Sequence, residues 1–316
     1  DLLYNQLLLQ PGSPNMLDIE ALQRRGVNVK YIPQNPILGS AAVVNFPDAG
    51  LESAIRDAIG KPTGDIHDAD VARLRVLDAR ERGIANLEGI QHCVDLKGLD
   101  LRDNQIVDIS TLSGLTNLTE LSLWENQISD ISAISGLTHL TTLDLDDNQI
   151  VDISALSGLT NLTTLGLADN QIVDISLLSG LTNLTGLYLW INEIVDISAL
   201  SGLTNLMLLD LSSNQIVDIS ALSGLTNLTE LWLADNQISD ISPLVNNIGI
   251  DDGDDVDLLY NQLLLQPGSP NMLDIAALQD RGVAVSYIPQ NPILGSAVVV
   301  NFPDPGLEAA IREAIG

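Results

Sequence analysis

Residues 159–180 read LTNLTTLGLADNQIVDISLLSG, and residues 181–202 read LTNLTGLYLWINEIVDISALSG. The same 22-residue pattern continues in both directions, from residue 96 to residue 247, in seven clear copies. One copy is too short to bury its own leucines, so neighbouring copies have to stack on one another. The repeat therefore predicts a solenoid with one coil per copy.

Within each coil, two leucines that alternate with variable residues predict a β-strand with one buried face. An invariant asparagine follows the strand. Because its amide both donates and accepts hydrogen bonds, a column of asparagines can satisfy the backbone of successive coils. The predicted inward leucines of four coils are Leu99, Leu101, Leu121, Leu123, Leu143, Leu145, Leu165 and Leu167. The asparagine column is Asn104, Asn126, Asn148, Asn170, Asn192, Asn214 and Asn236.

The rest of each coil, D-I-S-x-L-S-G, is too short for a regular helix. Its Asp and Ser favour turns and caps, so we expect short 3₁₀ turns on the convex side. A degenerate copy precedes the repeats, with Leu77 and Ala79 in its strand and Arg82 in place of the asparagine. Another follows them at residues 256–261.

The flanking segments are predicted to cap the two ends of the solenoid. Apolar spacing and a final glycine predict an amphipathic helix over 51–60, and a second helix is expected over 68–74. After the repeats, a helix is expected from Ser269-Pro270 through Arg281, followed by a strand over 283–287. Such caps would cover the leucines of the terminal coils.

The repeat resembles the leucine-rich repeat, in the 22-residue class of bacterial surface proteins typified by the internalins. The resemblance covers roughly half of the chain. It implies a leucine-rich-repeat solenoid of the α/β class, mostly β, with a parallel concave sheet and helical caps. It also implies an extracellular or cell-surface location and a protein or glycan ligand in the concavity. The internalins usually carry an immunoglobulin-like domain after the repeats, whereas here a helical cap is expected.

A longer period of 256 residues is also present, because residues 1–60 recur as 257–316 with eight differences. This recurrence predicts a tandem array of cassettes. The expected divisions are the C-terminal cap of a preceding cassette (1–34), a linker (35–45), the N-terminal cap with the degenerate first repeat (46–95), seven repeats (96–247), the C-terminal cap (248–290), a second linker (291–301) and the start of the next cassette (302–316).

Composition excludes several classes of partner. Thirteen Lys and Arg against 42 Asp and Glu give a formal charge of −29, so neither nucleic acid nor an anionic membrane is an expected partner. No apolar stretch is long enough to span a membrane. The single cysteine, Cys93, takes the register of the inward Leu115 and is expected to fill the core.

Catalysis finds little support, and the sequence predicts a protein that is not an enzyme. His67, His92 and His139 have no second histidine or cysteine at a metal-ligand spacing. His92 takes the register of Gly114, and His139 that of Asn117, so both are expected to be turn substitutions. No cofactor is expected.

Acidic residues form two columns and one cluster. The column that precedes each Ile-Ser is expected to cap the convex turn of its coil. The second column, at the end of the strands, brings like charges about 5 Å apart. The cluster at 251–255 is either a weak calcium site or a solvated turn, since it lacks the distal glutamate of a calcium loop. The candidate calcium ligands are Asp251, Asp252, Asp254 and Asp255.

The concave face carries the sharpest functional signal. All three tryptophans, and the one tyrosine of the repeats, fall at positions expected to point outward from the strands. Exposed aromatic residues in a cluster mark binding surfaces, although large rings can instead shield the strands from water. Gly166 and Gly186 are expected to leave room beside them. The candidate ligand-binding residues are Trp124, Tyr188, Trp190, Ile191, Leu208 and Trp232.

Two functions remain. The first is an extracellular structural or adhesive array, in which neighbouring cassettes dock head to tail into a fibre. Its basis is the mostly apolar junction at 35–44 and the separation of charge between the two ends. Loosely tethered cassettes are the alternative arrangement. The second is a recognition module that binds a protein or glycan on its concave face.

Overall fold

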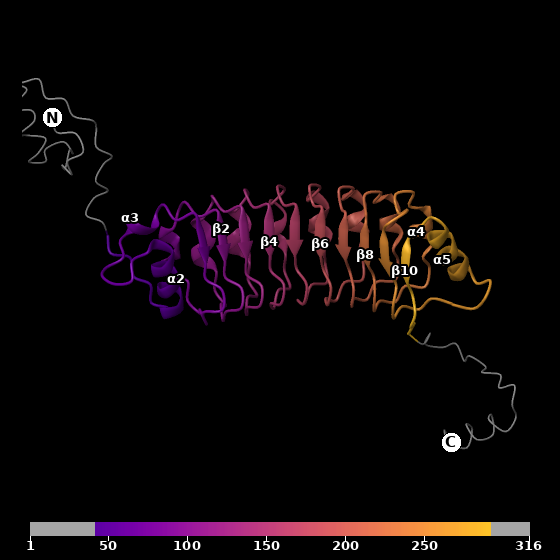
Figure 1. Ribbon diagram of the computed structural model, residues 1–316, viewed down its shortest axis with the longest axis horizontal. Coiled ribbons are helices and arrows are strands. Elements are labelled where there is room, and N and C mark those ends of the chain that lie inside the picture. Colours follow the sequence, from indigo (N-terminus) through magenta and orange to yellow (C-terminus); the bar gives the residue numbers. More distant parts are fainter. Residues whose placement is uncertain (1–41, 292–316) are drawn as a thin grey trace, which may run out of the picture.

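Ten short strands lie side by side in one parallel sheet, in chain order from β1 to β10, within residues 42–291, which the computed structural model describes (Figure 1). Between β1 and β8 each residue pairs with the residue 22 positions further on, as Leu99 does with Leu121. The predicted leucine-rich-repeat solenoid is confirmed. The strands are β1 (Val76–Asp78), β2 (Gly98–Asp100), β3 (Glu120–Ser122), β4 (Thr142–Asp144), β5 (Thr164–Gly166), β6 (Gly186–Tyr188), β7 (Leu208–Asp210), β8 (Glu230–Trp232), β9 (Asp255–Asp257) and β10 (Ala284–Ser286).

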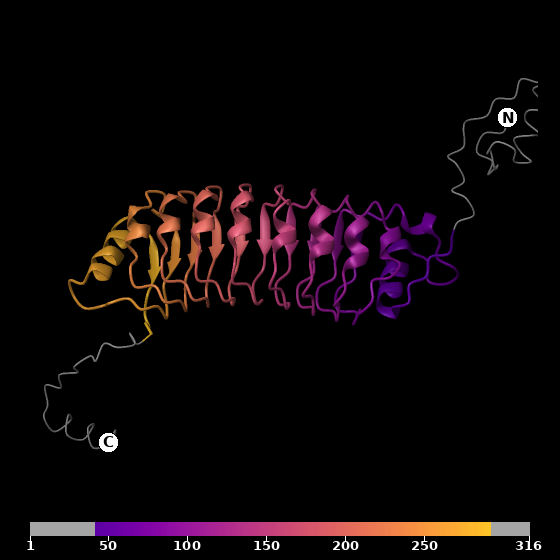
Figure 2. The ribbon, with the colours of Figure 1, turned by 180° about the vertical axis from the view of Figure 1, so that it is seen from behind.

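Short 3₁₀ turns form the opposite, convex side, as Figure 2 shows from behind. An aspartate precedes each turn of the seven repeats, and its Oδ1 accepts the N–H of the serine two residues later at 2.8–2.9 Å. The predicted capping role of this column is thereby confirmed. The turns are η1 (Ile90–His92), η2 (Ser110–Gly114), η3 (Ser132–Gly136), η4 (Ser154–Leu156), η5 (Ser176–Gly180), η6 (Ser198–Gly202) and η7 (Ser220–Gly224), and the last repeat has a helical turn, α4 (Ser242–Asn246).

One continuous apolar core runs between the sheet and the turns. The eight leucines predicted to point inward are at most 3% exposed. Cys93 is fully buried in the same core, as its register with Leu115 predicts. Burial raises the pKa of its thiol to about 12, which leaves it protonated and inert.

Helices cover the core at both ends. At the N-terminal end, α2 (Ala49–Ile59) begins two residues before the predicted helix and ends at Gly60, whose φ is 65°. The second predicted helix is shorter than expected, because α3 (Asp68–Val71) stops where the chain turns toward β1. At the C-terminal end, α5 (Pro270–Asp280) follows its predicted cap, Ser269.

Several predicted segments lie outside the described residues. They are the preceding cap at 1–34, most of the two linkers at 35–45 and 291–301, and the next cassette at 302–316. Within residues 42–291, no helix is long and apolar enough to cross a membrane.

Candidate binding surface on the concave face

The asparagine column holds the turn that ends each strand. In Asn148, Nδ2 donates to the carbonyl oxygens of Leu123 and Leu145 at 3.0 and 3.1 Å, and Oδ1 accepts the N–H of Ile128 at 3.0 Å. All seven asparagines of the column are at most 9% exposed. The column continues into the degenerate ninth coil, where Asn261 donates to Leu233. Each asparagine therefore joins neighbouring coils, which confirms its predicted structural role.

The outward residues of the strands form the concave face. Because each strand has only three residues, its first and third side chains point outward and its second points into the core. At the third position, Tyr188, Asp210 and Trp232 lie next to one another on β6, β7 and β8. Leu208 begins β7 and is half-buried. The surface thus alternates ring, carboxylate and ring, and is less apolar than the sequence predicts.

Three of the candidate binding residues, Trp124, Trp190 and Ile191, lie beyond the strands. Trp124 and Trp190 follow the ends of β3 and β6 by two residues. Glu125 and Ile191 come next, with φ of 55° and 50°, in the left-handed region. The equivalent residue of every coil from Glu81 to Tyr260 also has a positive φ, because the backbone turns there toward the asparagine. A left-handed residue disfavours continuation of a strand, and the sequence pattern alone does not reveal it.

Side chains fill the space that was expected beside Gly166. A Cβ atom at this position would lie 2.6 Å from Oδ1 of Asp146, so any other residue would have to displace this carboxylate. The carboxylate of Asp146 leans across this gap and accepts the N–H of Ala168 at 2.8 Å. The prediction of open room at Gly166 is therefore wrong. At Gly186, the ring of Tyr188 lies within 3.6 Å of where a Cβ would be.

Negative charge accumulates around the aromatic residues without any compensating cation. Burial, together with the neighbouring charges of Asp144 and Asp210, raises the pKa of Asp146 to about 7, although the hydrogen bond from Ala168 lowers it. Burial also raises the pKa of Asp210 and of Tyr188, and Glu230 adds to the effect on Tyr188. No Lys or Arg occurs between residues 103 and 256. The centre of the concave face is therefore an anionic surface with half-buried rings.

His139 and the acidic cluster have local partners. Nδ1 of His139 lies 2.9 Å from the carbonyl oxygen of Thr116, in place of the bond that Asn117 donates to Val94 one coil earlier. In the cluster at 251–255, Asp254 accepts the N–H of Asp251 at 2.9 Å. Within residues 42–291, no three His, Cys, Asp or Glu side chains converge as metal ligands. The two alternatives for this turn, a weak calcium site and a solvated turn, both stay predictions.

Comparison with known proteins places this geometry among leucine-rich repeats. The family model "Leucine Rich repeats (2 copies)" matches residues 116–158, 160–202 and 204–246. A crystal structure of internalin C2 from Listeria monocytogenes is similar at 40% identity with a TM-score of 0.65, over 75% of this chain and 100% of that chain.

Two more distant structures share the fold. A leucine-rich-repeat protein of Leptospira interrogans matches at 25% identity and a TM-score of 0.53, over 64% of this chain and 53% of its own. The plant peptide hormone receptor RGFR1, in complex with RGF2, matches at 25% identity and a TM-score of 0.51, over 63% of this chain and 33% of its own. No curated protein sequence matches the chain.

Proposed function

The chain belongs to the internalin-like leucine-rich-repeat proteins, and we propose that it is a secreted or surface-exposed scaffold that binds a protein partner on the concave face of its sheet. The observation that carries this proposal is the row of Tyr188, Asp210 and Trp232 on adjacent strands. Rings and a carboxylate side by side can anchor a partner at a few strong contacts.

The charges of the surface favour a basic partner. An Arg side chain can lie over an aromatic ring while its guanidinium donates to a carboxylate, and both contacts are available in this row. The half-buried carboxylate of Asp146 has no cation nearby, so a bound cation would relieve its repulsion with Asp144 and Asp210. A segment rich in Arg or Lys is therefore the expected ligand.

Selection from a displayed peptide library against the whole chain tests this function. The selected peptides should be enriched in Arg and Lys. Trp190→Ala and Trp232→Ala should leave the fold intact, and each should remove about 2 kcal/mol of binding, roughly thirtyfold in affinity. The matched control is Leu177→Ala on the convex side, where the side chain is 43% exposed. Unchanged affinity in the tryptophan variants, or a loss of affinity in the control, would contradict the proposed binding surface. The rings would then only shield the strands from water.

A second function rests on the 256-residue recurrence. Because residues 1–60 return as 257–316, the chain reads as one period of an array whose cassettes follow one another. Eight of the nine Lys and Arg between residues 42 and 291 lie between Arg56 and Arg102, whereas five acids lie between Asp251 and Asp257 at the other end. Nine acids lie among these eight bases, so the N-terminal end is close to neutral while the turn at the other end is acidic. Pairing of bases at one end with acids at the other favours head-to-tail docking into an adhesive or structural fibre.

Solution scattering of three consecutive cassettes tests the array. A single fixed angle between cassettes supports the fibre, and a broad distribution of angles contradicts it. Neither function needs a cofactor. Calorimetric titration with calcium should accordingly show no saturable binding at the turn 251–255.

A further inference from the structure

The sheet has a free edge at β1. In a parallel ladder, alternate residues bond to opposite neighbours. Ala79 and Glu81 donate to Asp100 and Arg102 of the next coil at 2.8 and 3.0 Å. The peptide groups of Val76 and Asp78 therefore face away from β2, and within residues 42–291 no hydrogen bond engages them.

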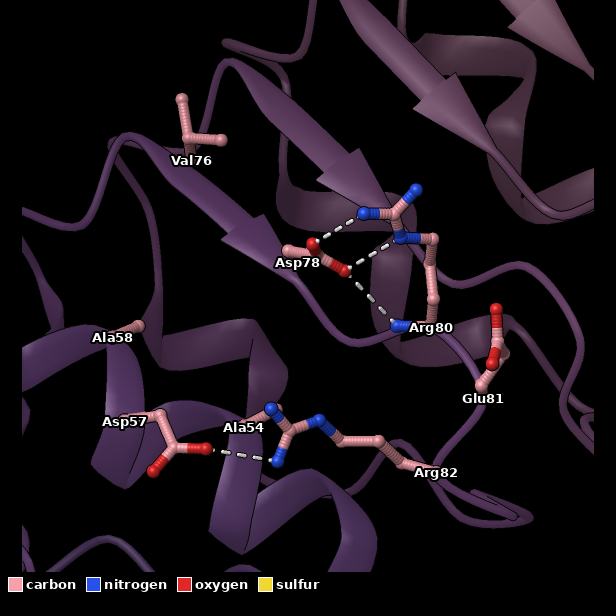
Figure 3. A pocket seen from close by; sticks show the side chains of 8 residues that line it. All are labelled: Ala54, Asp57, Ala58, Val76, Asp78, Arg80, Glu81 and Arg82. Carbon is pink, nitrogen blue, oxygen red and sulfur yellow. Dashed lines mark hydrogen bonds and ion pairs between the residues drawn. The ribbon is translucent and has the colours of Figure 1, made fainter.

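A groove of about 690 Å³ runs along this edge (Figure 3). The strand β1 forms one wall, and helix α2 forms the other with the small side chains of Ala54 and Ala58. Two ion pairs border it, Arg80 with Asp78 at 2.9 Å and Arg82 with Asp57 at 3.0 Å. The groove thus offers unpaired backbone beside a shallow wall, which suits an added strand.

The opposite end of the sheet has a matching free edge at β10. The N–H of Ala284 bonds to Asp254, and the carbonyl oxygen of Ser286 accepts from Leu258. The peptide group of Val285 therefore faces away from β9, and the described residues provide no partner for it. Both free edges belong to strands of three residues.

The chain carries a copy of β10 upstream of β1. Residues 28–30, Asn-Val-Lys, stand where β10 has Ala284, Val285 and Ser286. In the proposed array they belong to the preceding cassette, and eleven residues, 31–41, separate them from residue 42, where the described N-terminal cap begins. Such a short tether gives the segment a high effective concentration at the β1 edge.

We propose that this terminal strand of the preceding cassette, residues 28–30, adds in parallel to the free edge of β1 and so continues the sheet from one cassette to the next. The inference rests on the array proposed above. Extending the register of the sheet places Asn28, Val29 and Lys30 beside Val76, Leu77 and Asp78. Val29 then donates to the carbonyl oxygen of Val76, and Asp78 donates to that of Val29.

The side chains agree with this register. In this register Lys30 would come beside the exposed carboxylate of Asp78, which already pairs with Arg80, and would add an opposite charge across neighbouring strands. Where serine replaces this lysine, as Ser286 does in the second copy, the sheet already contains the same pairing: the hydroxyl of Ser122 donates to Asp144 at 2.9 Å. A parallel partner in this register is thus compatible with both the free backbone groups and the charge of Asp78.

Hydrogen exchange of the whole chain, followed at single amides, tests the pairing. Val29→Pro removes the donor to Val76 and should speed exchange of the Asp78 amide at least tenfold. Val285→Pro is the matched control, because it alters the equivalent residue of β10, which has no β1 after it in this chain. It should leave exchange at Asp78 unchanged. Lys30→Asp should speed the exchange as well, because it opposes two like charges.

Two outcomes would overturn the proposal. One is an Asp78 amide that already exchanges in the unaltered chain as fast as an unprotected amide. The other is an Asp78 amide that is protected equally in the unaltered chain and in Val29→Pro. A fixed inter-cassette angle by scattering, combined with either result, would leave the array standing and reject this junction. A broad distribution of inter-cassette angles, together with an unprotected Asp78 amide, would reject both the array and this junction.

Discussion

Asn148 stabilises two coils at once, because its amide satisfies carbonyl and N–H groups on both sides. Replacing it with alanine leaves these buried groups without partners. We expect Asn148→Ala to lower the free energy of unfolding by about 1–3 kcal/mol, measured by urea denaturation. Asn161→Ala is the control, since its exposed amide makes one bond to Thr138. Equal losses of free energy of unfolding in the two variants would contradict a stabilising role for the asparagine column.

Asp146 is expected to make stability depend on pH. Its pKa is about 7 in the folded protein and near 4 in the unfolded chain, so the folded protein binds the extra proton between these values. Its contribution to stability is therefore complete below pH 4 and is lost as the pH rises through 7.

Asp146→Asn removes this titration and keeps an oxygen for the N–H of Ala168. At pH 8 the free energy of unfolding of the variant should exceed that of the unaltered protein by about 1–2 kcal/mol. This difference should vanish at pH 4. Glu193→Gln, which removes an exposed charge on another coil, controls for net charge. An equal gain in the free energy of unfolding at both pH values would contradict a raised pKa for Asp146.

The carboxylate of Asp48 joins the start of helix α2 to the first coil, beside the ion pair of Asp57 with Arg82. Oδ1 of Asp48 accepts the N–H of Gly50 and Leu51 at the start of the helix, and its Oδ2 accepts those of Ala85 and Asn86 at 2.9 and 3.2 Å. Burial raises the pKa of this carboxyl, but the four hydrogen bonds outweigh burial and lower it.

Asp48→Ala should therefore loosen the N-terminal cap. We expect a loss of about 2 kcal/mol at neutral pH, measured by thermal and urea denaturation. Because the folded pKa is depressed, this contribution is present above pH 4 and is lost as the pH falls through the folded pKa. Asp108→Ala, which removes one N–H bond in an exposed turn, should cost about 0.5 kcal/mol. Similar losses in both variants would show that Asp48 does not join cap and coil.

The whole molecule is shaped by its negative charge. With 42 acids against 13 bases, and acidic columns repeated in successive coils, like charges face each other along the solenoid. Raising NaCl from 0.02 to 0.5 M shortens the screening length from roughly 20 to 4 Å. The melting temperature should rise by about 5 °C, as followed by circular dichroism. A melting temperature that stays constant or falls would mean that repulsion between coils is already relieved.

The sequence determines the fold through spacing. A 22-residue period with paired leucines and one asparagine leaves stacking as the only way to bury the leucines and to satisfy the backbone. For this reason the strands, the 3₁₀ turns and the buried Cys93 agree with prediction. The same period places the aromatic residues on one side of the coils. These features depend on local pattern and on neighbours at a constant distance.

Tertiary structure decides what the repeat does not encode. The left-handed turn at Ile191 ends the strand before Trp190, and the pattern gives no sign of it. Asp146 occupies the gap at Gly166, which lies one coil away, so its raised pKa arises only when the coils are stacked. The free edge of β1 likewise depends on where α2 packs. Periodicity specifies which side chains are buried, whereas contacts between coils and caps set the charge and access of the surface.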